Sequence, residues 1–401
     1  MNILVINSGS SSIKFQFINM KTDEVLAKGL LERIGIEGSV LNYYKGKEKK
    51  VITHPVKNHE QGIELIVSHL THPVDGVIKD KSEIYAIGHR VVHGGERFSG
   101  TVIITQEVID CLKACIPLAP LHNPPNIMGI EATQRILSGI PMTGVFDTAF
   151  HQTMPKQAYI YPIPYEYYEK NRIRRYGFHG TSHYYVARQG AKVMNKPLAE
   201  LKIITCHLGN GSSMTAIRHG QSVDTSMGLT PLEGLMMGTR CGDIDPAIAM
   251  FLQRNLGLDF EAIDNILNKQ SGMMGISGVS SDMRDVEAQV TAGNERATLA
   301  LDMFAYRIKK YIGAYIAAMN GVDLIIFTAG IGERDPWARK LVLKDMEFLG
   351  IEFDEEANEE AFGKFGVISR PNSRITVMVI PTNEELEIAE ETLAAVKKQS
   401  R

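Results

Sequence analysis

A turn rich in glycine and serine, set between two short apolar runs, occurs twice in this chain and constrains its fold more than any other feature. The first copy, Ile3 to Phe17, reads ILVINSGSSSIKFQF, and the second, Leu201 to Ile217, reads LKIITCHLGNGSSMTAI. In the first copy Ile13, Phe15 and Phe17 alternate with polar residues, which is the period of a strand with one buried face. The sequence therefore predicts two halves that each open with a β-hairpin.

Each turn suits an anion, because glycines let backbone N–H groups approach closely and serines add short donors. Neither copy is a Walker P-loop: G-x-x-x-x-G-K-[ST] is absent, and each turn leads into a strand rather than a helix. A plain hairpin is the alternative for either turn taken alone. The repetition favours phosphate binding, and a duplicated strand, turn and strand around one nucleotide resembles the actin, hexokinase and Hsp70 superfamily.

Composition indicates a globular protein with two domains. The chain has 401 residues, of which 44% are hydrophobic and 22% charged, and its net charge is -3. No concentrated basic face is evident, so we expect no nucleic-acid or membrane partner. No signal peptide opens the chain and no apolar run approaches membrane-spanning length, which predicts a cytoplasmic location. The four cysteines form no Cys-x-x-Cys pair and suggest neither a disulfide framework nor a metal site.

Several charged residues of the first half stand next to short apolar runs. Arg90 follows such a run and precedes Gly94-Gly95, so its guanidinium could grip a carboxylate or phosphate, with a surface salt bridge as the alternative. His89 and His93 lack the glutamate of H-E-x-x-H, which disfavours zinc. His122 lies in a proline-dense segment, residues 117 to 126, that we expect to be a stiff loop. Asp147 ends a buried strand, where it either reacts or caps the next turn.

The second half contains a long glycine-rich loop, Thr225 to Pro246, with Arg240 near its tip and a helix start at Asp245-Pro246. An amphipathic helix is predicted from Glu295 to Asn320, followed by a strand, Leu324 to Thr328, and a glycine turn. The final segment predicts a helix that packs on the N-terminal domain. In it Thr382 and Glu385 match a capping box, which leaves Glu384 free for another role.

These motifs together closely resemble bacterial and archaeal acetate kinase over nearly the whole chain. They are NSGSSSIKF (7–15), GHRVVHGG (88–95), FDTAFH (146–151), RRYGFHGTSH (174–183), HLGNGSS (207–213), GLTPLEGLMMGTRCGDIDP (228–246), TAGIGE (328–333) and NEEL (383–386). The resemblance implies an α/β fold of two duplicated ribonuclease-H-like domains of the actin type with an interdomain nucleotide cleft. It implies an N-terminal domain of residues 1–148 plus 385–401 and a C-terminal nucleotide-binding and dimerisation domain of residues 149–384.

The same resemblance assigns roles to individual residues. It implies that Arg90, His122, Asp147, His179 and Arg240 are catalytic and that Asn7 and Glu384 bind Mg²⁺, with Mn²⁺ as an alternative. The substrate pocket is implied to consist of Arg90, Val92, Leu121, Phe178 and Pro231. The ATP or ADP site is implied to consist of Lys14, His207, Leu208, Gly209, Asn210, Gly211, Asp282, Met283, Arg284, Gly330, Ile331, Gly332, Glu333 and Arg334.

The implied reaction is phosphoryl transfer from ATP to acetate, giving ADP and acetyl phosphate, in a homodimer. Acetate is already ionised at neutral pH and needs no general base, so we favour direct in-line transfer with Asp147 orienting Mg²⁺ or its waters. A propionate or butyrate kinase is the close alternative, because one methylene gives only about 1–3 kcal/mol of discrimination. A non-catalytic actin-like nucleotide-binding protein is the second alternative. The combination of Arg90, His179 and Arg240 argues against it.

Overall fold

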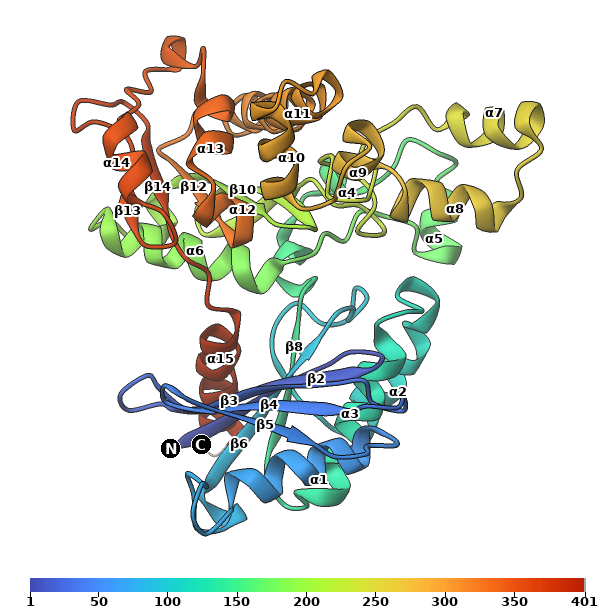
Figure 1. Ribbon diagram of the computed structural model, residues 1–401, viewed down its shortest axis with the longest axis vertical. Coiled ribbons are helices and arrows are strands. Elements are labelled where there is room, and N and C mark those ends of the chain that lie inside the picture. The colour runs from blue at the N-terminus through green and yellow to red at the C-terminus, as the bar shows by residue number, and fades with distance from the viewer. Residues whose placement is uncertain (400–401) are drawn as a thin grey trace. The chain divides into compact units, whose positions relative to one another are not determined.

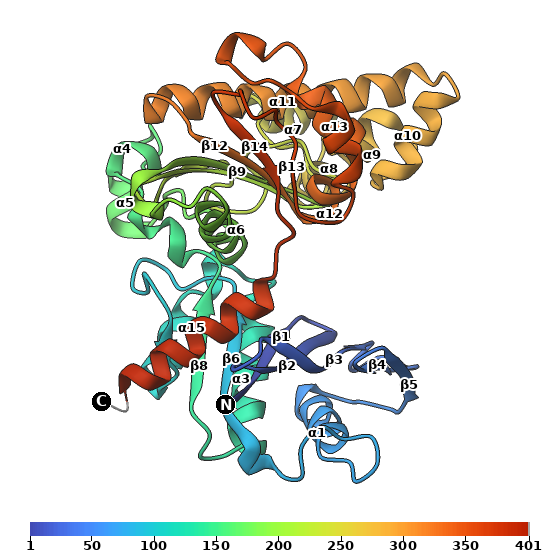
Figure 2. The same ribbon diagram turned by 90° about the vertical axis from the view of Figure 1, so that its left-hand side faces the viewer.

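A computed structural model describes residues 1–399, and the chain divides into two compact units. The first comprises Met1–Phe150 and the C-terminal segment that starts at Asn383, and the second comprises His151–Thr382. Each unit is one β-sheet with helices on both faces (Figures 1 and 2). The predicted α/β class is confirmed.

The sheet of the first unit has the strand order β5-β4-β3-β2-β1-β6-β8-β7. Strand β1 pairs antiparallel with β2 and parallel with β6, which pairs parallel with β8. Leu4 and Ile6 of β1 enter one core, and Ile3 and Val5 enter another, so this strand is buried on both faces. The strands are β1 Asn2–Ser8, β2 Ser12–Asn19, β3 Glu24–Glu32, β4 Val40–Lys45, β5 Glu48–Thr53, β6 Ile84–Val91, β7 Val102–Ile103 and β8 Met142–Phe146.

Helices cover both faces of this sheet. Helices α1 (His59–Leu70) and α3 (Asn123–Ile136) contribute to the core that contains Phe15 and Phe17, and α2 (Gln106–Ala114) packs beside α3. Helix α15 (Glu384–Gln399) packs on β1, β6 and β8 from the opposite face, as the sequence predicts (Figure 2). Burying an aromatic side chain as completely as Phe17 stabilises the fold by roughly 1.5–3 kcal/mol.

The sheet of the second unit has the order β11-β10-β9-β12-β14-β13. Strand β9 pairs antiparallel with β10 and parallel with β12, which pairs parallel with β14. This is the pattern of β1, β2, β6 and β8, so the predicted duplication is confirmed. The strands are β9 Lys202–Leu208, β10 Ser212–Arg218, β11 Gln221–Thr225, β12 Leu324–Thr328, β13 Gly366–Val367 and β14 Thr376–Val379.

Helix α11 (Glu295–Met319) packs its buried stripe, which includes Phe304, Ile308 and Ile312, on one face of this sheet, and α6 (Gly180–Val193) lies on the other (Figure 1). The remaining helices are α4 Lys156–Tyr159, α5 Glu166–Asn171, α7 Ala247–Leu256, α8 Phe260–Lys269, α9 Gly272–Ser277, α10 Met283–Thr291, α12 Ala329–Arg334, α13 Pro336–Leu343 and α14 Glu355–Glu360. Short 3₁₀ turns are η1 Lys81–Glu83, η2 Ile116–Leu118, η3 Ala149–Thr153, η4 Leu198–Glu200 and η5 Glu347–Leu349.

Three local predictions are wrong. The proline-dense segment is not all loop, because α3 starts at Asn123 and its prolines occupy the first turn, where a missing N–H costs no helical hydrogen bond. The glycine turn after β12 is helix α12. Thr382 is not the cap of α15: Asn383 Oδ1 accepts from Leu386 N–H at 3.1 Å, so the cap lies one residue later. The helix after Pro246 starts at Ala247, whose N–H donates to Asp245 Oδ1.

Candidate active site

The first unit holds a partly buried ion pair at the ends of two adjacent parallel strands. Arg90, next to last in β6, donates from Nε to Asp147 Oδ1 at 3.1 Å and from Nη2 to Asp147 Oδ2. Asp147 directly follows β8 and is 2% exposed, while Glu384 Oε2 lies 3.9 Å from Arg90 Nε. Burial raises the pKa of Asp147 to about 6, although Arg90 opposes this effect. Asp147 thus occupies one edge of the guanidinium and leaves the other edge for a ligand.

Two buried asparagines of α3 secure the chain around this pair. Asn126 Oδ1 accepts from Val92 N–H at 3.0 Å, and its Nδ2 donates to the Ser8 carbonyl at 2.8 Å. Asn123 exchanges hydrogen bonds with the backbone of His93 in the same way. These contacts tie the segment after β6 to the glycine turn after β1. The sequence analysis missed both residues. The pattern that could have indicated them is a pair of asparagines three residues apart in the first turn of a helix.

The other predicted residues of this unit differ in exposure and in their contacts. Val92 is buried, whereas Leu121 is 77% exposed and His122 is exposed just before α3. Asn7, near the end of β1, is directly opposite Lys14 of β2, and Lys14 forms an ion pair with Glu385. His89 is buried, which lowers its pKa to about 3, so it behaves as a core residue.

Oxygen donors near Arg90 suit a hard divalent cation. Asp147 and Glu384 both approach the same guanidinium, and Asn7 adds an amide oxygen at the end of β1. Within residues 1–399 no three His, Cys, Asp or Glu side chains form a ready metal cage. Mg²⁺ needs no such cage, because one or two carboxylates, water and substrate phosphates are its usual ligands. The donor chemistry therefore fits Mg²⁺.

In the second unit, two predicted catalytic side chains meet the glycine turn between β9 and β10. A Cβ built on Gly211 would lie 3.4 Å from Arg240 Nη1 and 3.8 Å from His179 Cε1, so both groups border this turn. His179 has a left-handed backbone (φ 56°), and its ring stacks on His207 with centroids 4.1 Å apart. Its Nδ1 bonds Ser213 Oγ at 2.8 Å. A histidine and an arginine thus converge on the glycine turn between β9 and β10.

A partly buried arginine–glutamate pair holds the loop that carries Arg240. Arg175 donates to the carbonyls of Thr225, Ser226 and Met227 and, from Nη2, to Glu233 Oε1 at 2.6 Å. Tyr161 donates its hydroxyl to Glu233 and accepts from Leu229 N–H at 2.9 Å. Arg240 Nη1 in turn donates to the Pro231 carbonyl at 3.1 Å. The sequence analysis missed this network, because its members are as much as 72 residues apart.

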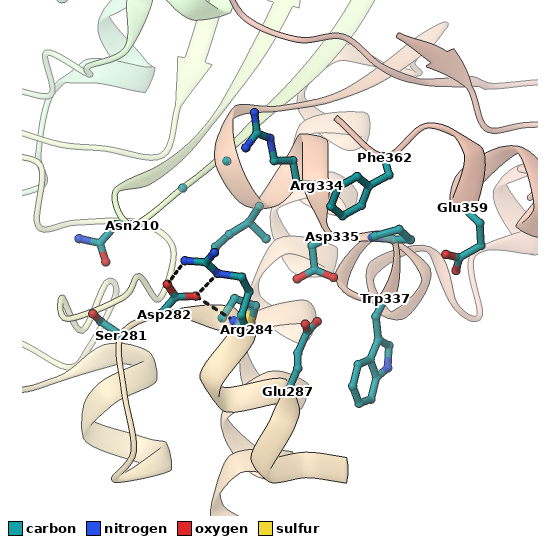
Figure 3. Close-up of a pocket in the computed structure, with 15 residues that line it drawn as sticks. Asn210, Ser281, Asp282, Arg284, Glu287, Arg334, Asp335, Trp337, Glu359 and Phe362 are labelled. Atoms are coloured by element: carbon teal, nitrogen blue, oxygen red, sulfur yellow. Dashed lines mark hydrogen bonds and ion pairs between the residues drawn. The ribbon is translucent and has the colours of Figure 1, made fainter. Parts of the chain in front are cut away.

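A pocket of about 730 Å³ lies within the second unit (Figure 3). Eight of the predicted nucleotide residues line it, namely Gly209, Asn210, Asp282, Met283, Arg284, Gly330, Ile331 and Arg334. The structure therefore brings together three segments that are far apart in the sequence.

Other predicted nucleotide residues do not line this pocket. Leu208 is buried in the core, and Gly332 packs against β9 and β12. Glu333 Oε1 accepts from the N–H groups of Ala329 and Thr382, so its side chain ties two chain segments together. Pocket residues that sequence reasoning missed are Ser281, Glu287, Asp335, Pro336, Trp337, Glu359 and Phe362.

Comparison with known proteins gives this arrangement a family. The model of the acetokinase family matches residues 2–390. The chain belongs to the acetokinase family. The acetate kinase of Caldanaerobacter subterraneus subsp. tengcongensis is 59% identical over 399 residues, with 99% of each chain covered. The crystal structure of Porphyromonas gingivalis acetate kinase superposes with a TM-score of 0.96 at 49% identity, covering 98% of this chain and 99% of that one.

A propionate kinase from Francisella tularensis is also similar, with a TM-score of 0.91, 44% identity, and coverage of 98% of this chain and 99% of that one. The curated acetate kinases at 56–59% identity are closer to this chain, so the propionate alternative is not favoured. Membership of the acetokinase family over the full chain makes this protein an ATP-dependent phosphotransferase that acts on acetate.

Proposed function

We propose that the chain transfers the γ-phosphoryl group of ATP directly to acetate, and that Arg240 and His179 stabilise the group in transfer. The observation that carries this proposal is the convergence of both side chains on the Gly211 turn. The transition state spreads negative charge over the equatorial oxygens, and cationic or hydrogen-bonding groups held in place stabilise that charge without reorganising.

Arg90 is the proposed acetate ligand. Its edge toward Asp147 is occupied, and its remaining N–H groups match a second carboxylate. Acetate is ionised at neutral pH, so one of its oxygens can attack phosphorus without giving up a proton. The new bond joins that oxygen to phosphorus, the bond from phosphorus to the β,γ-bridging oxygen breaks, and ADP and acetyl phosphate result. Asp147 then orients Arg90 rather than acting as a base.

Asn7 and Glu384 are the proposed Mg²⁺ ligands, with Asp147 orienting the ion or its waters. When bound, Mg²⁺ would neutralise charge on the β- and γ-phosphates. Val92, Leu121, Phe178 and Pro231 are the proposed contacts for the acetate methyl group, and His122 would assist the transfer. The nucleotide would occupy the pocket of Figure 3, with its phosphates toward the turn at Gly209.

The test is acyl phosphate formation with acetate, propionate and butyrate side by side, trapped as the hydroxamate. We expect the highest kcat/KM with acetate and no product without Mg²⁺. Chirally labelled γ-phosphate separates the mechanisms: direct in-line transfer inverts the configuration at phosphorus, and a phosphorylated carboxylate intermediate retains it. Net retention would defeat the direct mechanism and leave the activity intact.

We propose a homodimer joined through the second unit. Helix α7 buries none of its side chains, and Phe251, Leu256 and the nearby Phe260 are 58%, 62% and 73% exposed. An apolar face of this kind is typical of a surface that a partner covers. Sedimentation equilibrium should show a dimer that Phe251→Asp dissociates.

We also propose a cytoplasmic location, supported by four free thiols and testable by cell fractionation. Along residues 1–399, no helix has the length and apolar composition needed to cross a bilayer.

A further inference from the structure

The pocket of Figure 3 has two chemically different ends. Asn210, next to the glycine turn after β9, lies at one side of the residues drawn, and Trp337, Glu359 and Phe362 lie at the other. Backbone N–H groups of glycine turns attract phosphates, whereas carboxylates repel them. A nucleoside triphosphate in this pocket would therefore direct its phosphates toward Asn210 and its base toward the opposite end.

Two carboxyl groups face each other between the two ends of this pocket (Figure 3). Glu287 comes from α10 and Asp335 precedes α13, and their side chains point toward one another in Figure 3. Glu287 Oε1 is buried, and within residues 1–399 no N–H or O–H group of another residue donates to it. Burial, followed by the negative charge of Asp335 and a hydrogen bond with its side chain, raises the pKa of Glu287 to about 8. At neutral pH one proton is shared by the pair.

The shared proton determines what Glu287 offers a ligand. Burial raises the pKa of Asp335, but three neighbours favour its ionised form: the Ala338 N–H, from which it accepts a hydrogen bond at 2.8 Å as the cap of α13, the Glu287 side chain and the Arg339 guanidinium. Asp335 is therefore the acceptor within the pair, and protonated Glu287 is its donor. The second oxygen of Glu287 is then a carbonyl acceptor at the pocket wall. Apolar side chains also line the pocket, including Met283, Ile331 and Trp337.

We propose that Glu287 is a specificity-determining residue for the nucleoside, and that its carboxyl oxygen accepts a hydrogen bond from the 6-amino group of adenine. Asp335 holds the carboxyl in the required orientation. Apolar walls beside one acceptor suit a flat purine with an exocyclic amine. The inference rests on the proposed nucleotide site and adds the base preference of that site.

The first test compares kcat/KM for ATP and for purine riboside triphosphate, which differs from ATP only by the missing 6-amino group. We expect the wild type to prefer ATP roughly tenfold, because the analogue leaves the Glu287 acceptor without a donor. Glu287→Gln should keep this preference, since an amide donates to Asp335 and still presents an oxygen. Glu287→Met should reduce the preference to about twofold or less. Glu360→Gln, the same change on an exposed position of α14, should match the wild type.

A second comparison distinguishes the base from the ribose, whose hydroxyls are also donors. The ratio of kcat/KM for ATP to that for 2′-deoxyATP should be the same in wild type and Glu287→Met. A change confined to this ratio would overturn the proposal in favour of a ribose contact. An unchanged preference for ATP over the analogue in Glu287→Met would overturn it outright, as would loss of that preference in Glu287→Gln.

Binding without turnover provides an independent readout. Trp337 is the only tryptophan in the chain and lines the pocket, so its fluorescence should report adenosine and purine riboside binding directly. Adenosine should bind wild type more tightly than purine riboside by roughly tenfold, and Glu287→Met should lose the difference. If no nucleoside triphosphate supports acyl phosphate formation, the proposed function fails. If all of them do so equally in wild type, only the base assignment fails.

Discussion

The two units share one strand topology, but different kinds of residue lie at the ends of their corresponding strands. In the first unit, Arg90 near the end of β6 and Asp147 directly after β8 form a partly buried ion pair. In the second unit, the equivalent strand β12 ends at Thr328 and is followed by Ala329, which has a left-handed backbone and begins the short helix α12. The first set of strand ends carries fixed charges, whereas the end of β12 leads to Gly330 and Ile331, which line the pocket of Figure 3. Under the proposed function, one scaffold serves a small carboxylate in one copy and a nucleotide in the other.

The largest effect is expected from removing Arg240, the cation beside the second glycine turn. Arg240→Ala should lower kcat by roughly 10³-fold, because an arginine that stabilises a transferring phosphoryl group contributes on this scale. The KM for acetate should change far less, since the effect lies in the transition state. Steady-state kinetics would show this, with Arg218→Ala, an exposed arginine at the end of β10, as control. Near-normal turnover of Arg240→Ala would mean that His179 and the turn suffice.

The matching test in the first unit removes Arg90. Arg90→Ala should raise the KM for acetate roughly 10- to 100-fold, the expected loss of a charged hydrogen-bonding partner. It should also leave the buried Asp147 carboxyl unpaired, so its pKa should rise further because burial then acts without opposition. Arg135→Ala, which removes an exposed arginine paired with Glu60, is the control. A raised KM for ATP with an unchanged KM for acetate would contradict the proposal that the first unit binds acetate and the second binds the nucleotide.

A smaller effect is expected from the network that holds the Arg240 loop. Glu233→Gln keeps the shape of the side chain but removes the charge that Arg175 pairs with, so kcat should fall roughly tenfold through misplacement of Arg240. The KM values should stay near those of the wild type. In a double mutant with Arg240→Ala, the Glu233→Gln effect should disappear, because both changes act through one group. Fully additive losses would show that Glu233 acts elsewhere.

Sequence reasoning succeeded where a short segment determines its own structure. The two hairpins follow from strand periodicity around a glycine turn, and the buried stripe of α11 follows from helical spacing. It failed at Asn123, because the prolines that were interpreted as part of a loop lie in the first turn of a helix. It also failed at Thr382, because the neighbouring asparagine provides the helix cap. Glu287 and Asp335 were beyond its reach, because their partnership exists only once α10 and α13 are packed into one unit.

The last expected effect is on the free energy of unfolding rather than on activity, and it concerns that carboxyl pair. Glu287 has an ordinary pKa of 4.5, raised to about 8 in the folded protein by burial and by Asp335 and Asp282. Between these values the folded state holds a proton that the unfolded chain has released. The folded state therefore loses stability as pH rises from about 5 to 8. Glu287→Gln cannot release this proton.

The stability advantage of Glu287→Gln over wild type should accordingly grow from pH 5 to pH 8, measured as the difference in urea midpoint between the two proteins. Glu360→Gln should show no such growth, because it is exposed. A constant difference across this pH range would mean that Glu287 is already ionised in the folded state. The acceptor oxygen proposed for adenine would then belong to a carboxylate, and Glu287→Gln would no longer be a neutral mimic of the native side chain.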